Sequence, residues 1–298
     1  MLAVCIPVYN QDVSNLVKDL LMQKSKLEQE VSIVVIDDHS SQGFQKQYDL
    51  FSGQVKVIKR SQNIGRSKIR NAFLEHTEAK YLLFLDCDSQ VIRSDFLSKY
   101  IERLQKEETT ALLFGASIYQ SEKPNRKHRL RWKYGALKES KRYSERLKNP
   151  NLSFKTNNFL IERDTFSKHR FNEKIIGYGH EDTLFGFQLE QNKIEISHID
   201  NPVLNAVIDT NSEFLNKTDE ALRNLIHIWE LTDCNVNLLS RIRILKIHQR
   251  LSRVPLVSLF FMVFLKPSRF MLQKGVASLV LFDLYKLSFL LSLKKNTN

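Results

Sequence analysis

Two aspartates, separated by a single residue, follow an apolar run in the first third of the chain. Residues 82–85 read Leu-Leu-Phe-Leu, and Asp86-Cys87-Asp88 follow directly. A buried strand has no use for charge at its end unless a ligand there needs it. Paired carboxylate oxygens suit a divalent cation, which can in turn hold a diphosphate. Asp is also frequent in turns after strands, so this interpretation depends on support from the rest of the chain.

Polar side chains also follow two other expected strands. Residues 2–7 lead into Asn10, and the apolar run 31–36 leads into Asp37 and Asp38. Apolar residues at helical spacing occur between such runs, for example at positions 13, 16, 17, 20 and 21. This alternation predicts an α/β fold with an open, mostly parallel sheet covered by helices on both faces. Ligands of such sheets bind beyond the carboxyl ends of the strands, where these polar residues should meet.

A second acidic pair, Glu181-Asp182, follows the segment Gly177-Tyr178-Gly179 at the expected start of a helix. A carboxylate at such a place can accept the proton of a reacting hydroxyl group. Acidic residues in the first turn of a helix are also favoured by the helix dipole alone. The pair therefore has a catalytic interpretation only together with the carboxylates at the strand ends.

The composition is that of an ordinary globular protein in a reducing compartment. Hydrophobic residues make up 42% of the chain and charged residues 26%. The three cysteines lack the spacing of a zinc site or of a disulfide framework. The N-terminal residues lack the basic and apolar regions of a signal peptide, so we expect a cytoplasmic location.

The net charge of +12 comes from two segments. Residues 121–150 hold eleven Lys or Arg against three Glu, and residues 240–298 hold eleven against one Asp. Such blocks attract nucleic acid or an anionic membrane surface. Within residues 123–148, cations alternate with Trp132 and Tyr134. This segment fits a loop that meets a diphosphate or an anionic acceptor, and it equally fits a solvated basic helix.

The sequence predicts an α/β domain at residues 1–235, followed by a separate basic and apolar helical region at residues 236–298. The apolar run 254–265 has 12 residues, fewer than the roughly 20 of a spanning helix. The run 276–293 carries Asp283 and Lys286 in its middle. Basic residues beside apolar helices suit a membrane interface, so we expect a peripheral protein on the inner face of the cell membrane. The alternative is that these helices dock on the α/β domain or form an oligomer contact.

In these segments, the chain resembles the inverting glycosyltransferases of family two, which use nucleotide sugars and have the GT-A fold. The resemblance covers roughly residues 2–235 and implies a Rossmann-like central sheet flanked by helices. The motifs that carry it are residues 6–10 (Ile-Pro-Val-Tyr-Asn), 35–41 (Val-Ile-Asp-Asp-His-Ser-Ser), 63–66 with 70–71 (Asn-Ile-Gly-Arg and Arg-Asn), 86–88 and 177–182 (Gly-Tyr-Gly-His-Glu-Asp).

The resemblance implies a role for each of these motifs. Asp37 would hydrogen-bond the base of the nucleotide, and Asp38 would support that loop. Asp88 would be the main ligand of a Mn²⁺ or Mg²⁺ ion, and Asp86 would face the ribose or the metal indirectly. Asp182, paired with Glu181, would be the general base. The nucleotide pocket would also be lined by Pro7, Val8, Asn10, Asn63, Gly65, Arg66 and Arg70, with an arginine near the diphosphate.

One position departs from the family pattern. Family members often complete the metal site with a histidine after an Asn-Pro pair, whereas here Asn201-Pro202 is followed by Asn205 at that place. His198 is the other candidate ligand, although its neighbours favour a strand residue. The metal would then be held by Asp88, the diphosphate and water. This departure puts the strength of metal dependence, and activity itself, in question.

The leading hypothesis is a membrane-associated enzyme of polysaccharide biosynthesis that serves the cell envelope. It would move a sugar from a nucleoside-diphosphate sugar to a saccharide or lipid-linked saccharide. A nucleotidyltransferase would need a glycine-rich phosphate loop, and residues 8–11 contain no glycine. A nucleic-acid-binding protein would leave the carboxylates without a purpose, so no nucleic acid is expected. An inactive scaffold with the same fold stays open because of Asn205.

Overall fold

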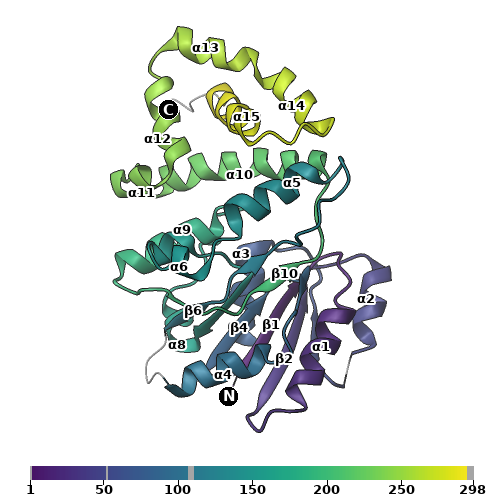
Figure 1. The fold of residues 1–298 in the computed structure, drawn as a ribbon. Coiled ribbons are helices and arrows are strands. Elements are labelled where there is room, and N and C mark those ends of the chain that lie inside the picture. The colour runs from purple at the N-terminus through teal and green to yellow at the C-terminus, as the bar shows by residue number, and fades with distance from the viewer. Residues whose placement is uncertain (1, 52, 107–110, 294–298) are drawn as a thin grey trace. The chain divides into compact units, whose positions relative to one another are not determined.

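The computed structural model describes residues 2–51, 53–106 and 111–293 (Figure 1). The chain divides into two compact units. The first comprises Met1–Gln120, Glu139–Lys174 and Glu181–Val207, and the second Ser121–Lys138, Ile175–His180 and Ile208–Asn298. The expected division of function at residue 235 stays a prediction, and its last residues, 294–298, lie outside the described ranges.

The described residues of the first unit form two sheets. The larger has seven strands in the order β3-β2-β1-β4-β8-β6-β9, and the smaller has three in the order β5-β10-β7. Strands β1 to β4 run parallel, and β8 runs antiparallel to both β4 and β6. The predicted mostly parallel sheet is therefore confirmed. The strands are β1 (Leu2–Val8), β2 (Val31–Asp37), β3 (Lys56–Lys59), β4 (Tyr81–Leu85), β5 (Ser89–Gln90), β6 (Leu112–Phe114), β7 (Ser117–Ile118), β8 (Asn158–Glu162), β9 (Ser197–His198) and β10 (Val203–Asn205).

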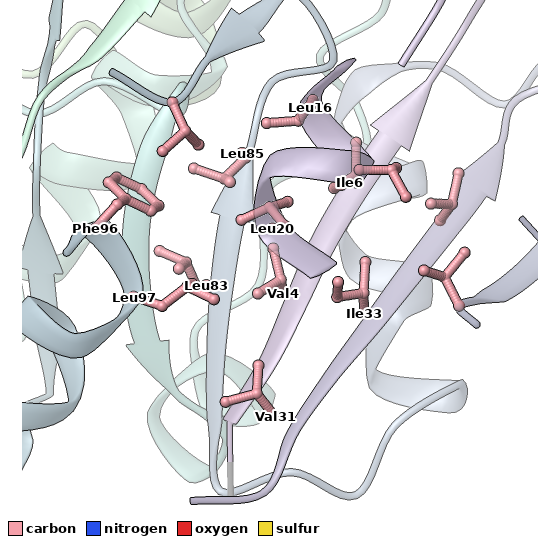
Figure 2. Packing of buried hydrophobic residues seen from close by; sticks show 14 of the residues in the cluster. Val4, Ile6, Leu16, Leu20, Val31, Ile33, Leu83, Leu85, Phe96 and Leu97 are labelled. Carbon is pink, nitrogen blue, oxygen red and sulfur yellow. The ribbon is translucent and has the colours of Figure 1, made fainter. Parts of the chain in front are cut away.

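Alternate residues of the central strands face two separate hydrophobic layers, as the pleat of a strand requires. Val4 and Ile6 of β1 pack under α1 and α4, whereas Ala3 and Cys5 face α3, α8 and α9. Figure 2 shows the first layer, where Leu16 and Leu20 of α1 lie over β1, β2 and β4. The helices of this unit are α1 (Ser14–Lys24), α2 (Gln42–Asp49), α3 (Arg66–Ala72), the 3-10 turn η1 (Phe73–Glu75), α4 (Phe96–Lys106), α6 (Tyr143–Arg146), α7 (Pro150–Ser153), α8 (Arg163–Lys168) and α9 (Glu181–Gln191).

Residues 111–118, which read Ala-Leu-Leu-Phe-Gly-Ala-Ser-Ile, are split between the two sheets. The break falls at Gly115 and Ala116, and Ala116 has a φ of 69°. A Cβ atom at Gly115 would lie 2.2 Å from the Tyr100 hydroxyl and 2.5 Å from Asn158 Nδ2. Asn158 is buried and holds this crossing by donating to the carbonyl groups of Ala116 and Asn201. A polar network thus turns the chain from β6 into β7.

The described part of the second unit is built from helices. They are α5 (Arg129–Tyr134), the π-helical turn η2 (Gly135–Glu139) at the unit boundary, α10 (Asn211–Leu231), α11 (Val236–Arg241), α12 (Arg243–Leu251), α13 (Pro255–Val263), α14 (Leu265–Gln273) and α15 (Leu279–Ser292). Their common core contains Leu130, Phe214, Leu272, Phe282 and Tyr285. The expected helical C-terminal extension is present, and part of the basic segment 123–148 is helical.

The glycine-rich loop before α9 packs closely against α10 rather than moving freely. Asn224 Nδ2 donates to the carbonyl oxygens of Tyr178 and Gly179. Gly179 has a φ of 97°, and a Cβ atom there would lie 2.5 Å from Ala221 Cβ. Glycine is therefore required here by both conformation and space. The loop is therefore held in place by its contacts with α10.

Candidate active site

The carboxylates of Asp86 and Asp88 follow β4 directly, as predicted. Asp86 N donates to the carbonyl of Asn157 (3.1 Å), and Ser89 N donates back to the carbonyl of Asp86 (3.0 Å). The carbonyl of Asp88 accepts from Ala206 N (3.2 Å). Burial, with a smaller effect of Asp88 and Asp86, raises the pKa of the intervening Cys87 thiol to about 12. The thiol is therefore protonated near neutral pH, and the side chains that can bind a cation in this turn are oxygen donors.

Two arginines of α3 hold Asp86 from one side. Arg66 and Arg70 are four residues apart and so lie on the same face of the helix. Arg70 is 2% exposed, and its Nη2 lies 2.7 Å from Asp86 Oδ1. Arg66 is partly exposed, and its Nη2 lies 3.7 Å from Asp86 Oδ2. The predicted donor-site residues of α3 and β4 are thus brought together.

Glu181, the first residue of α9, completes this network. Arg66 Nε donates to Glu181 Oε1 (2.9 Å), and Arg70 Nη1 lies 3.8 Å from the same oxygen. Glu181 is buried, with 6% of its side chain exposed. Two cations and two anions therefore join α3, the end of β4 and the start of α9, which we call the Arg66–Glu181 network (Arg66, Arg70, Asp86 and Glu181).

Asp38 fixes the loop that leads into α3. Its Oδ1 accepts from Ile64 N (2.7 Å) and its Oδ2 from Gly65 N (2.9 Å). Asn63 Nδ2 donates to the Asp38 carbonyl (3.1 Å). Gly65 precedes the helix with a φ of 84°, a conformation that glycine adopts without strain. Asp38 thus supports the loop at residues 63–65 as well as its own.

Asp37 and Asn10 link the ends of β2 and β1. Asp37 is fully buried, and it accepts from Ser40 N (2.9 Å) and from Gln45 Nε2 (3.1 Å). Asn10 N donates to Ser40 Oγ, and Asn10 Oδ1 accepts from Ser41 N, both at 2.8 Å. Pro7 and Val8 belong to β1, next to this junction. The structure brings these four predicted pocket residues together, and base recognition by Asp37 stays a prediction.

Asp182 lies in the first turn of α9, as predicted, and contacts a lysine that the sequence reasoning missed. Lys155 Nζ lies 3.0 Å from Asp182 Oδ2, and Asp182 Oδ1 accepts from Thr183 N (2.6 Å). Lys155 precedes β8 in an irregular segment, where neither spacing nor a motif marks it. Only the folding of this segment against the start of α9 reveals the pair.

His198 is not brought together with the two carboxylates of the strand end. It lies in β9, as its neighbours predict, and it is buried. Its Nδ1 is 2.9 Å from Arg146 Nη1, and its Nε2 is 3.2 Å from the Pro150 carbonyl. Burial and the adjacent Arg146 lower its pKa to about 4. One ring nitrogen thus contacts Arg146 and the other the Pro150 carbonyl, so His198 serves packing, and no motif in the sequence marks Arg146 as its partner.

The donors near Asp88 fit a cation that is shared with a phosphate ligand. Within the described ranges, no group of three or more His, Cys, Asp or Glu side chains could hold a metal ion. Asn205 pairs with Ser89 across the small sheet, and its Nδ2 donates to Ser117 Oγ. Mg²⁺ commonly uses one or two carboxylates together with substrate phosphates and water. Asp88, with Asp86 beside it, fits this mode of binding.

Solved structures with the same fold include a mannosyltransferase and TarS. PcManGT from Pyrobaculum calidifontis, solved with GDP-Man and Mn²⁺, is 12% identical with a TM-score of 0.56, over 77% of this chain and 64% of that one. This chain thus spans less than two thirds of that protein. S. aureus TarS 1–349 is 16% identical with a TM-score of 0.52, over 96% of this chain and 89% of its own. Its complex with UDP-GlcNAc gives the same values.

These likenesses show the fold, which is GT-A. None of the curated proteins compared with this chain matches it. The family model described as glycosyl transferase family 2 matches residues 3–170, which is more than half of the 298 residues. The match includes the ends of β1, β2 and β4, together with both arginines of α3. The chain therefore belongs to glycosyl transferase family 2.

Proposed function

We propose that this protein transfers a sugar from a nucleoside-diphosphate sugar to a hydroxyl group of a saccharide or lipid-linked saccharide, with inversion at the anomeric carbon. The observation that carries the proposal is the Arg66–Glu181 network. It joins the carboxylate at the end of β4 to the first residue of α9, and Asp182 is the next residue along that helix. The same four residues therefore connect the candidate donor site to the helix that carries the candidate general base.

In the proposed reaction, Asp182 accepts the proton of the acceptor hydroxyl as its oxygen attacks the anomeric carbon. The bond from that carbon to the phosphate oxygen breaks on the opposite side, and the nucleoside diphosphate leaves with the electron pair. Arg66, which is partly exposed at the end of β4, can meet the negative charge of the leaving diphosphate. Arg70 and Glu181 are too deeply buried for this, and they position Asp86 and Arg66.

A divalent cation at Asp88, Mn²⁺ or Mg²⁺, would supply Lewis-acid stabilisation of the leaving diphosphate. Asp86 is held by two arginines, which favours an indirect role for it at the cation or at the ribose. The relatives solved with GDP-Man and Mn²⁺ or with UDP-GlcNAc support a nucleotide-sugar donor of this kind. We assign Asp37, Asp38, Asn10, Asn63 and Gly65 to the walls of the nucleotide pocket.

The test is the hydrolysis of nucleotide sugars, with water as the acceptor. UDP-GlcNAc and GDP-Man are incubated with the protein and Mn²⁺, and the released nucleoside diphosphate is quantified. Asp182→Asn should lower the rate about 10²- to 10⁴-fold, because a general base contributes a factor of that size. Thermal stabilisation by the free nucleoside diphosphate should persist in this variant.

Asp164 provides a matched control, because it is an exposed acidic residue in the first turn of another helix, α8. Asp164→Asn should hydrolyse the donor at the unchanged rate. Equal rates for Asp182→Asn and the unchanged protein would refute the general base. Failure of every nucleotide to bind would instead favour an inactive scaffold with this fold.

A further inference from the structure

A large apolar surface is exposed on α13 and α14 of the second unit. Leu256, Leu259, Phe260 and Val263 are between 58% and 81% exposed, and their spacing puts them on one face of α13. Phe270 and Met271 extend this surface on α14. We call these six residues the apolar face. Soluble proteins rarely expose large contiguous apolar patches without a partner.

A basic helix leads directly into the apolar face. On α12, Arg243, Lys246 and Arg250 are exposed at positions i, i+3 and i+7, and Arg253 follows at i+10. The opposite side of this helix buries Leu245. We call the four cations the basic face. Between residues 236 and 298 the sequence contains a single acidic residue, Asp283, and its carboxylate lies 2.7 Å from Lys286 Nζ.

The inner side of the same helices is packed within the unit. Helices α12, α13 and α14 all pack against α15 (Figure 1). Arg269 of α14 contacts Asp219 of α10 (2.6 Å), Asn216 of α10 (2.6 Å) and the hydroxyl of Tyr285 in α15. By length and composition alone, the stretch Pro255–Gln273 is able to cross a membrane, and 11% of it is buried. Crossing would pull Arg269 away from Asp219 and leave partly buried charges unpaired, which is costly.

We propose that the apolar and basic faces together bind the surface of an anionic lipid bilayer, with α13 and α14 lying in the interface rather than spanning it. Leu256, Phe260 and Val263 would enter the boundary between headgroups and acyl chains, while the arginines of α12 meet lipid phosphates. An anionic lipid surface can bind both the apolar face, through its acyl chains, and the basic face, through its phosphates. Nucleic acid would satisfy only the charge, and a second copy of this chain would bring a like charge. In the cell the corresponding surface is the inner face of the cytoplasmic membrane.

Flotation of the full chain with vesicles tests this surface without any enzyme assay. Vesicles of phosphatidylcholine with about one-third phosphatidylglycerol should carry the protein upward in the gradient, and vesicles of phosphatidylcholine alone should bind it far more weakly. Arg250→Gln with Arg253→Gln should weaken binding by roughly fivefold for each charge removed. Leu259→Ser with Phe260→Ser should weaken it by at least about tenfold.

Exposed residues elsewhere give matched controls. Lys18→Gln with Lys26→Gln removes two exposed charges from the first unit, and Leu50→Ser removes an apolar side chain that is 75% exposed. Both controls should bind the vesicles unchanged. Because all the substituted side chains are largely exposed, their melting temperatures should stay within a few degrees of the unchanged protein.

Four outcomes would overturn the proposal. The first is equal vesicle binding by the double variants and the controls. The second is a lipid-free dimer, seen by light scattering, that Leu259→Ser with Phe260→Ser dissociates, which would make the apolar face a contact between copies. The third is salt-sensitive binding to nucleic acid without any binding to vesicles. Membrane-bound protein that resists an alkaline carbonate wash would replace the interfacial arrangement with a spanning one.

Discussion

At the scale of single residues, the contact between Lys155 and Asp182 describes the resting state of the candidate base. The ammonium group lies 3.0 Å from the carboxylate, and Lys155 is 46% exposed. A nearby cation favours the ionised form of a carboxylate, which is the form that accepts a proton. In the mechanism that we propose, Lys155 would position Asp182 and keep it ionised for an incoming hydroxyl group.

Lys155→Met tests this role through the pH dependence of donor hydrolysis. Without the ammonium group, the base is harder to ionise, so the acidic limb of kcat/KM should move to higher pH. Lys168→Met, an exposed lysine of α8, should leave the profile in place. A profile that falls in amplitude but keeps its pH limbs would contradict the electrostatic role and leave a purely structural one.

At the scale of elements, the Arg66–Glu181 network stabilises the junction of α3, β4 and α9. Arg70→Met leaves the carboxylates of Asp86 and Glu181 without one of their two cations. Breaking a buried ion pair in this way costs about 3 kcal/mol or more of the free energy of unfolding. Urea unfolding measures the loss. Lys59→Met removes an exposed pair with Asp49 and should cost less than about 1 kcal/mol; equal losses in both variants would contradict the buried network.

The β9 strand adds a pH-dependent contribution through His198. Its folded-state pKa of about 4 lies below the ordinary value of 6.5, so the unfolded chain binds the extra proton between these pH values. The contribution of neutral His198 to the free energy of unfolding is complete above pH 6.5 and is lost as the pH falls towards 4. The loss should be on the order of 2 kcal/mol.

His198→Gln removes this titration while keeping a polar side chain. Its free energy of unfolding should be lower than that of the unchanged protein at neutral pH, and it should fall less steeply between pH 6.5 and pH 4. His169→Gln, outside β9, serves as the control and should retain the slope. An unchanged slope in His198→Gln would show that other groups cause the acid sensitivity.

At the scale of the whole molecule, a bound nucleotide should stabilise the native state by mass action. UDP or GDP at about 100 times its dissociation constant adds roughly 3 kcal/mol to the free energy of unfolding. One nucleoside diphosphate should therefore raise the melting temperature in the presence of Mn²⁺. Asp88→Ala should lose the part of this increase that depends on Mn²⁺. An increase that is equal with and without Mn²⁺ would contradict the assignment of Asp88.

Much of the first unit is predictable from local patterns. The expected strands at residues 2–7, 31–36 and 82–85 lie within one residue of the bounds of β1, β2 and β4, because buried apolar runs are local signals. The small sheet of β5, β7 and β10 is not predictable, since its strands have two or three residues. Their pairing arises from Gly115 and Asn158, which bring distant segments together.

The sequence by itself determined the α/β class, the family resemblance and the carboxylates at the strand ends, because strand periodicity and short motifs are properties of neighbouring residues. Tertiary structure alone decided the partners of those carboxylates. Arg66 and Glu181 are 115 residues apart in the chain. Lys155 and Asp182 are separated in the chain by β8 and α8, yet they form an ion pair. Such ion pairs leave no periodic signal in the sequence, because the two charged residues of each pair come close together only when the chain folds. The same reason explains why His198 is a packing residue beside Arg146.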